Sequence, residues 1–217
     1  MTNKFTKFHS SIWNANFGTL IYERFPEKQS NLWKIGGDHD RGKHLSLDHE
    51  LIFHSRFESG NLNKVYFRED KRKGKIYTLI LENDTNTFGY NQWFYFCVRS
   101  KKTYETVKFE IVNMRKSYSL FNRGMKIAVF CSHLYEKDKI GWHRNGNNIE
   151  YDLNGLDDGG HKLATLSFEY TFASDKETYF AYAYPYTFTQ LKKHLKEYEL
   201  AHKQVAIKKV GLSLLKN

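Results

Sequence analysis

The chain has 217 residues, of which 40% are hydrophobic and 17% aromatic, and its formal net charge is +10. This length fits one all-β domain with a short appendage, and the many Tyr and Phe residues favour sheet over a helical bundle. Two cysteines, Cys97 and Cys131, exclude a disulfide framework, and no segment approaches the length of a membrane span. We expect a cytoplasmic protein with buried, reduced thiols, unless the fold brings the two cysteines together.

The first fifty residues are polar and irregular. We interpret residues 1–50 as an N-terminal arm packed on the core, with one short strand at 32–35. A β-sandwich domain is then expected over 51–217. Its first strand, at 51–57, ends in a turn rich in Ser, Gly and Asn.

Two strand-like segments, 64–68 and 75–81, flank a charged turn and predict a β-hairpin. The turn carries four basic residues, Lys71, Arg72, Lys73 and Lys75. A cluster this short is usually a solvated turn, but it is also a candidate surface for an acidic partner.

Four further segments continue the sheet. Residues 92–98 are apolar at nearly every position, which predicts a central strand covered on both faces. Polar and apolar residues alternate along 106–111, so this strand should have one face in water. Residues 126–131 and 149–151 read as strands separated by a turn around Gly146, and a Gly- and Asp-rich loop at 154–160 should interrupt the sheet again.

The last strands and a helix follow. Apolar and polar residues alternate along 163–172, and 178–184 form an aromatic segment. We therefore predict two antiparallel paired strands joined by a turn at 175–176. From Thr187 onward the period becomes helical, which predicts an amphipathic helix ending near residue 203. This helix carries the basic residues Lys192, Lys193 and Lys196. Residues 205–217 look like one more strand.

The sequence contains few signs of catalytic or metal chemistry. Four histidines recur at intervals of five, but this spacing scatters side chains around a helix and alternates faces on a strand, so it disfavours a preformed metal site. The usual phosphate, dinucleotide, hydrolase and zinc-protease motifs are missing. Aromatic and basic residues alternate in 95–102, yet without an RNA-binding motif they fit core packing better than nucleic-acid binding. The histidines are His39, His44, His49 and His54.

Several motifs, in a fixed order along 51–217, resemble the amino-terminal domain of the cytosolic carboxypeptidases, zinc enzymes that trim glutamates from tubulin tails. The resemblance implies an antiparallel β-sandwich that precedes a zinc carboxypeptidase domain, packs on it and helps to shape its substrate cleft. The residues that carry the resemblance are Phe57, Ser59, Gly60, Asn61, Gln92, Trp93, Phe94, Asn113, Ser117, Gly124, Met125, Trp142, Arg144, Tyr184, Pro185 and Tyr186.

The same resemblance implies that the zinc ligands and the catalytic Glu belong to the second domain. This chain contains no His-Pro pair of the kind that carries those ligands, and it stops where that domain should begin. We therefore expect no catalytic residue, no metal ligand and no cofactor in this chain. Ala173, Ala183 and Lys192 depart from the residues usual in the family, which bears on the interface with a catalytic domain.

Three functional hypotheses follow. The first is a non-catalytic relative that binds tubulin or microtubules, in cilia or elsewhere in the cytoskeleton, through the two basic groups described above. The second is the non-catalytic part of an active deglutamylase. The third is a scaffold subunit of a large assembly. An acidic protein surface or a carboxypeptidase domain is the expected partner, whereas a membrane is not expected and nucleic acid is disfavoured.

Overall fold

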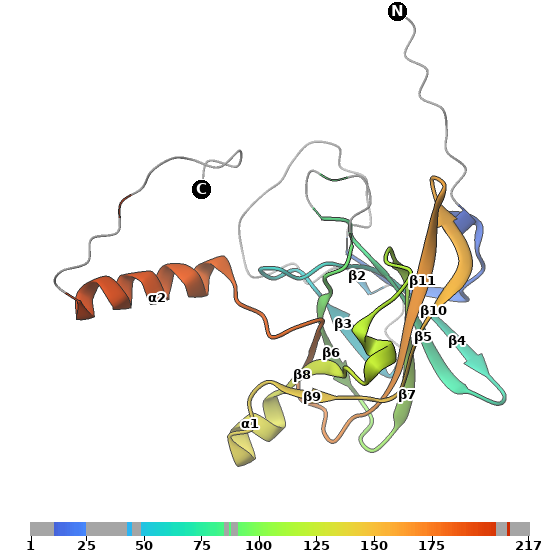
Figure 1. The fold of residues 1–217 in the computed structure, drawn as a ribbon. Coiled ribbons are helices and arrows are strands. Elements are labelled where there is room, and N and C mark those ends of the chain that lie inside the picture. The colour runs from blue at the N-terminus through green and yellow to red at the C-terminus, as the bar shows by residue number, and fades with distance from the viewer. Residues whose placement is uncertain are drawn as a thin grey trace, which may run out of the picture. The chain divides into compact units, whose positions relative to one another are not determined.

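The computed structural model describes residues 11–24, 43–44, 49–84, 87, 91–202 and 208. The chain divides into two compact units, Met1–Tyr184 and Pro185–Asn217, and each is described by itself. The first unit contains two β-sheets, and the second contains one helix (Figure 1). The predicted β-sandwich with a helix near the C-terminus is confirmed.

The larger sheet has seven strands within the described residues, in the order β10-β11-β7-β5-β4-β1-β2. Neighbouring strands are antiparallel, except that β5 and β7 run parallel. The predicted hairpin is confirmed, because β4 and β5 pair across a short turn. The strands are β1 (Thr19–Glu23), β2 (Lys43–His44), β4 (Leu62–Asp70), β5 (Gly74–Leu81), β7 (Thr106–Met114), β10 (Asn147–Asp158) and β11 (His161–Thr171).

The smaller sheet has five antiparallel strands in the order β3-β6-β12-β8-β9. They are β3 (Leu51–His54), β6 (Tyr95–Ser100), β8 (Ile127–Cys131), β9 (His143–Asn145) and β12 (Thr178–Ala181). Three short helical segments accompany the sheets, namely η1 (Ser11–Asn14), η2 (Leu120–Arg123) and α1 (Ser132–Asp138).

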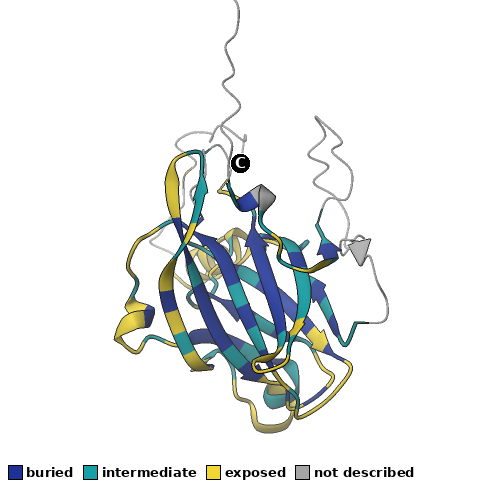
Figure 2. Cartoon of the chain, turned by 90° about the vertical axis from the view of Figure 1, so that its right-hand side faces the viewer, coloured by how far each residue is buried: buried dark blue, intermediate teal, exposed yellow. Residues whose placement is uncertain are grey.

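An aromatic core joins the two sheets. Phe109 of the larger sheet contacts Phe53, Phe96 and Phe180 of the smaller one, with ring centroids 6.3, 6.3 and 5.5 Å apart. All four side chains are fully buried. Figure 2 shows buried residues along the central strands and exposed ones at the turns. The high aromatic content of the sequence therefore supplies this core, because large rings fill the space between two sheets and bury much apolar area.

The predicted pairing of the last two strands is wrong. β11 pairs with β10 and β7 in the larger sheet, whereas β12 pairs with β6 and β8 in the smaller sheet. The connection between them crosses from one sheet to the other. Alternation along each segment specifies a strand with one buried face, but it does not specify the partner, which long-range packing selects.

Other boundaries also differ from the predictions. β6 begins at Tyr95, and β10 runs through the expected break to Asp158, so that only the turn at Gly159 and Gly160 remains. α1 and β9 lie where the sequence predicted a turn. Within the expected irregular arm, β1 is a strand of the larger sheet. The strand predicted at 32–35 lies outside the described residues, and so does the one predicted at 205–217 apart from Lys208.

The second unit contains α2 (Phe188–Ala201), which confirms the predicted helix. Thr187 caps it: its hydroxyl accepts from the backbone N–H of Gln190 at 3.2 Å, and the Gln190 side chain accepts from the backbone N–H of Thr187 at 2.8 Å. This reciprocal pair satisfies two donors that a helix start leaves open. The apolar side chains at helical spacing, Leu191 and Leu195 among them, are exposed.

Candidate interaction surfaces

A layer of aromatic rings covers the outer face of the smaller sheet, the face turned away from the core. Successive side chains of a strand point to opposite faces, so Tyr95 and Tyr179 lie outside while Phe96 and Phe180 lie inside. We call this set the outer aromatic layer. Its members are Phe57, Trp93, Tyr95, Phe130, Trp142, Tyr179 and Tyr184.

The rings of this layer form a continuous series of contacts. Tyr95 is central, with ring centroids 4.7 Å from Phe57, 5.8 Å from Trp142 and 6.1 Å from Trp93. Trp142 extends the series to Tyr184 at 6.4 Å. Most members are half-buried, and Tyr184 is exposed. The layer is thus an apolar surface that other parts of the described chain cover incompletely.

Arg144 fixes the edge of the layer where the first unit ends. Its guanidinium donates to the carbonyl oxygens of Lys126 and Tyr182 at 2.7 and 2.9 Å. It also lies over the ring of Tyr184, with 5.5 Å from Cζ to the centroid. Both hydrogen bonds come from Nη1, which leaves the rest of the planar guanidinium over the ring, whereas the ammonium of a lysine is one compact group without such a second part. Arg144 therefore sets the path of the chain beside the aromatic rings.

The chemistry of the layer is that of packing. Burial raises the pKa of Tyr95 to about 12, and the nearby Cys97 thiol adds to the effect. Burial also raises the pKa of Tyr179. Both hydroxyls therefore stay protonated and neutral near pH 7, and the layer presents aromatic area and hydroxyl groups without a charged nucleophile.

Several motif residues hold the loops that carry this layer. The Asn61 side chain donates to the carbonyl oxygen of Trp93 at 2.8 Å and accepts from the backbone N–H of Tyr95 at 3.0 Å. The indole N–H of Trp93 donates to the Ser59 carbonyl oxygen at 2.8 Å. At Gly60 an added Cβ would lie 2.3 Å from the Ser55 carbonyl oxygen. Only glycine fits this approach, so the motif sequence is explained by backbone packing.

The other motif residues lie in different surroundings. Asn113 is buried and bridges to Leu81, donating to its carbonyl oxygen and accepting from its N–H, each at 2.9 Å. Phe94 is buried in the core, Met125 packs against the core, and Gln92 is half-buried. Ser117 is exposed, and Gly124 ends η2 in the left-handed region. Pro185 and Tyr186 belong to the second unit, where the Tyr186 hydroxyl lies 2.9 Å from His194 Nδ1.

The predicted basic turn is present between β4 and β5. Lys71, Arg72 and Lys73 are exposed there, and Asp70 accepts hydrogen bonds from the backbone N–H groups of Arg72 and Lys73 at 2.8 and 2.9 Å. These three cations lie together at the tip of the hairpin. Their side chains face solvent, as a partner surface requires.

Lys75 differs from its neighbours because it is only partly exposed and already pairs with carboxylates of this chain. Its ammonium group bonds the carboxylates of Glu50 and Glu105, and Glu50 also bonds Lys102. Burial alone would raise the pKa of Glu50, but the hydrogen bonds from Lys102 and Lys75 lower it to about 2. Lys75 is therefore a structural cation that joins strands, and it contributes little to a surface for an external acid.

The predicted helical lysines are all exposed on α2. The Lys192 ammonium lies 4.4 Å from the centroid of Phe188, and Lys193 lies 3.7 Å from the Glu197 carboxylate. Lys196 completes the group. This basic group and the hairpin turn belong to different units of the chain.

The histidine series does not come together in the part of the chain that the structure describes. His49 packs against Phe67 at 5.0 Å, and His54 stacks on Phe57 at 5.1 Å, while His39 lies outside the described residues. Among the described residues, no group of three or more His, Cys, Asp or Glu could hold a metal ion. Cys97 and Cys131 are buried and not disulfide-bonded. No described helix combines the length and apolar character that crossing a bilayer requires.

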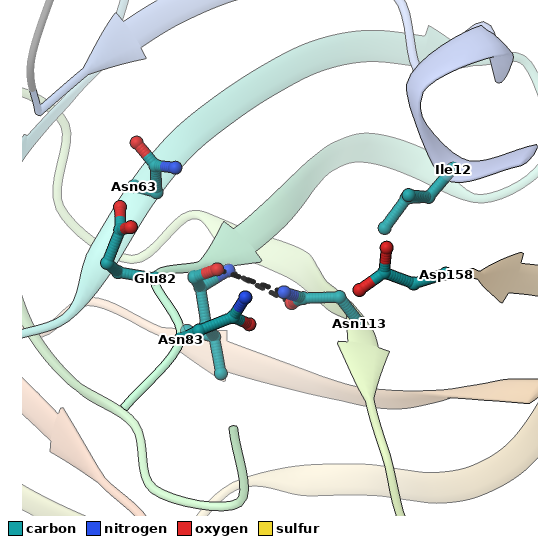
Figure 3. A pocket seen from close by; sticks show the side chains of 7 residues that line it. Ile12, Asn63, Glu82, Asn83, Asn113 and Asp158 are labelled. Carbon is teal, nitrogen blue, oxygen red and sulfur yellow. Dashed lines mark hydrogen bonds between the residues drawn. The ribbon is translucent and has the colours of Figure 1, made fainter. Parts of the chain in front are cut away.

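One pocket of about 60 Å³ lies at the rim of the larger sheet. Figure 3 shows its polar residues, with Glu82 and Asn63 on one side and Asp158 on the other. Burial raises the pKa of Glu82, opposed by the charge of Arg24 and then of Lys64. This volume has room for a few water molecules and excludes a peptide. The lining residues are Ile12, Asn63, Leu81, Glu82, Asn83, Asn113 and Asp158.

Sequence reasoning missed the outer aromatic layer as a surface. It assigned 92–98 to the centre of the sandwich, covered on both faces, yet Trp93 and Tyr95 lie on the outer face. A signal was available within 93–96, where the outward residues are Trp and Tyr, whose polar atoms suit a boundary, while the inward ones are Phe.

Comparisons with known proteins agree with this fold. A family model described as cytosolic carboxypeptidase N-terminal domain matches residues 53–183. Cytosolic carboxypeptidase 2 of Homo sapiens is 38% identical over 189 residues, covering 82% of this chain and 20% of that protein. Cytosolic carboxypeptidase 1 of Xenopus laevis is 41% identical over 161 residues, covering 70% of this chain and 13% of that protein.

Solved structures show the same architecture. A metallo-carboxypeptidase from Burkholderia cenocepacia is similar with a TM-score of 0.52 and 18% identity, over 76% of this chain and 37% of that one. A metallo-carboxypeptidase from Pseudomonas aeruginosa gives the same TM-score at 21% identity. The chain spans about a fifth or less of the length of the curated relatives cited above. The chain belongs to the cytosolic carboxypeptidase family, and it corresponds to the N-terminal domain of these proteins.

Proposed function

We propose that this chain acts as a non-catalytic docking domain, which packs against a carboxypeptidase domain through the outer aromatic layer. The observation that carries the proposal is the position of the family-motif residues: Phe57, Trp93, Trp142 and Tyr184 all contribute rings to one incompletely covered face. Contiguous apolar area of this kind marks an interaction site. Any zinc would then belong to the partner domain, and we propose no cofactor for this chain.

The end of the first unit supports this choice of partner. The sandwich ends at Tyr184, a ring of the layer itself, and Arg144 holds the chain there. A domain that packs against this edge, in a longer relative or as a separate chain, would contact the layer. The share of the curated relatives that this chain does not match leaves ample length for such a domain.

Co-expression tests the docking proposal. The tagged chain is produced together with human cytosolic carboxypeptidase 2 from which the matching N-terminal region has been deleted. We expect the two to co-purify, and we expect W142A together with Y184A to abolish co-purification. A matched variant, Tyr104→Ala, removes an exposed ring outside the layer and should have no effect. Equal recovery with all three forms would contradict the proposal.

We also propose a second function, the binding of acidic tubulin tails, which would place the protein in the cytoplasm at microtubules or cilia. It is supported by the net charge of +10 and by the exposure of Lys71, Arg72 and Lys73 and of the α2 lysines. Co-sedimentation with microtubules should occur at low salt and fall as salt rises. Binding that survives proteolytic removal of the acidic tails would contradict this function.

A further inference from the structure

The connection between β7 and β8 has an unusual charge balance. The sequence contains no Asp or Glu between Glu110 and Glu136, although 27% of the whole chain is charged. The same interval contains four cations, Arg115, Lys116, Arg123 and Lys126. We call residues 115–126 the basic loop. Its positive charge is not offset by acidic residues nearby in sequence.

The basic loop has a defined backbone structure. Phe121 is buried and packs on Tyr182 with ring centroids 5.8 Å apart. The Asn122 side chain donates to the Tyr151 carbonyl oxygen at 2.9 Å, and the Tyr151 hydroxyl donates to the Lys116 carbonyl oxygen at 2.5 Å. These bonds tie the loop to β10. A loop held in this way loses little conformational entropy when it binds a partner.

The side chains of the loop are, by contrast, largely free for a partner. Tyr118 is 78% exposed and Leu120 is 57% exposed. Lys116, Arg123 and Lys126 are exposed, and none of the three forms an ion pair with a carboxylate of the described residues. Arg115 is the exception, since it pairs with Asp158 at 2.6 Å.

The two basic groups predicted from sequence are less suited to an acidic partner. Glu69 and Asp70 directly precede the hairpin-turn cations, and Glu197 and Glu199 stand among the α2 lysines. The cations of the basic loop have no acidic residue close to them in sequence. The loop also adds two exposed apolar side chains that can pack on a bound segment. Specific recognition combines such apolar contacts with charge complementarity.

We infer that the basic loop is a docking surface for an acidic peptide segment, held by Lys116, Arg123 and Lys126 and packed on Tyr118 and Leu120. The inference rests on the second proposed function and moves its site from the hairpin turn and α2 to this loop. We favour a peptide over a lipid surface because two apolar side chains on one short loop give little area for insertion. A single exposed ring likewise offers no series of stacking platforms for nucleic acid.

Two charge-reversal variants with equal change in net charge test the inference. The loop variant is K116E/R123E/K126E, and the turn variant is K71E/R72E/K73E. The probe is a fluorescein-labelled peptide of alternating Glu and Gly, with a Gln and Gly peptide as the neutral control. Because the loop variant reverses the three charges that hold the peptide and the turn variant reverses none of them, the loop variant should raise the Kd about tenfold or more and the turn variant about twofold at most.

The outcomes separate the two ideas. If the unmodified chain binds the acidic peptide and both variants weaken binding equally, the loop assignment is overturned while acidic-partner binding stands. If the unmodified chain does not bind it at all, the second proposed function fails as well. Binding to phosphatidylserine vesicles in place of the peptide would also overturn the inference. Y118A with L120A, which removes mostly exposed side-chain atoms, should weaken peptide binding while changing the unfolding midpoint little.

Discussion

The two faces of the smaller sheet use aromatic residues in different ways. On the inner face Phe96 and Phe180 are fully buried against Phe109 of the opposite sheet. On the outer face Tyr95 and Tyr179, one residue away in each strand, are only half-buried. The inner rings have all their partners within the sandwich, so their role is stability. The Tyr95 and Tyr179 rings carry hydroxyl groups and lack full cover, which is what the proposed docking surface requires.

The largest expected effect comes from the centre of the inner face. Phe109→Ala removes the ring that joins both sheets and leaves a cavity, so we expect a loss of about 3 to 5 kcal/mol in the free energy of unfolding. Urea denaturation followed by Trp fluorescence measures it. Tyr184→Ala on the outer face should cost about 1 kcal/mol or less. Similar losses in the two variants would show that the faces do not differ as described.

A smaller effect is expected at Gly60, which positions the loop that carries Phe57. A Cβ there would lie 2.3 Å from a backbone oxygen, so Gly60→Ala should destabilise the fold by about 1 to 3 kcal/mol. Gly141→Ala is the control, since nothing lies within 4 Å of the added Cβ. Thermal unfolding of both variants separates steric overlap from a general effect of replacing glycine. A neutral Gly60→Ala would mean that the loop can shift.

Arg144 tests how firmly the edge of the outer layer is held. Arg144→Gln loses two charge-assisted hydrogen bonds to carbonyl oxygens, and we expect a loss of about 1 to 2 kcal/mol because the site is exposed. Arg144→Lys should not restore full stability, since the shorter lysine side chain places its one nitrogen short of the Nη1 position and has no plane to lie over Tyr184. Denaturation curves for the pair provide the measurement, and full rescue by Lys would contradict this geometry.

The smallest effect concerns the charged link beside the aromatic core. Glu50 has a pKa of about 2 in the fold, below its ordinary value of 4.5, so its contribution to stability is present above pH 4.5. It should fall away as the pH drops from 4.5 towards 2. The stability difference between the unmodified chain and Glu50→Gln should therefore be larger at pH 7 than at pH 3. A difference independent of pH would rule out the lowered pKa.

Local features of the fold were predictable because their causes are local. The hairpin of β4 and β5 follows from two apolar segments around a charged turn, and α2 follows from its helical period and the Thr187 cap. The family, too, could be recognised from short motifs. The basic loop could have been found by noting the gap between Glu110 and Glu136, a charge pattern that needs no coordinates.

The sequence by itself therefore determined the fold class, the family and the places of most of the strands and of α2. Only the tertiary structure decided that β11 and β12 belong to different sheets, that Lys75 forms ion pairs with Glu50 and Glu105, and that Tyr95 faces outward. The physical reason is shared by all three. Alternation and propensity act over neighbouring residues, whereas strand partners, ion pairs and the cover over a sheet face depend on residues far apart in the chain.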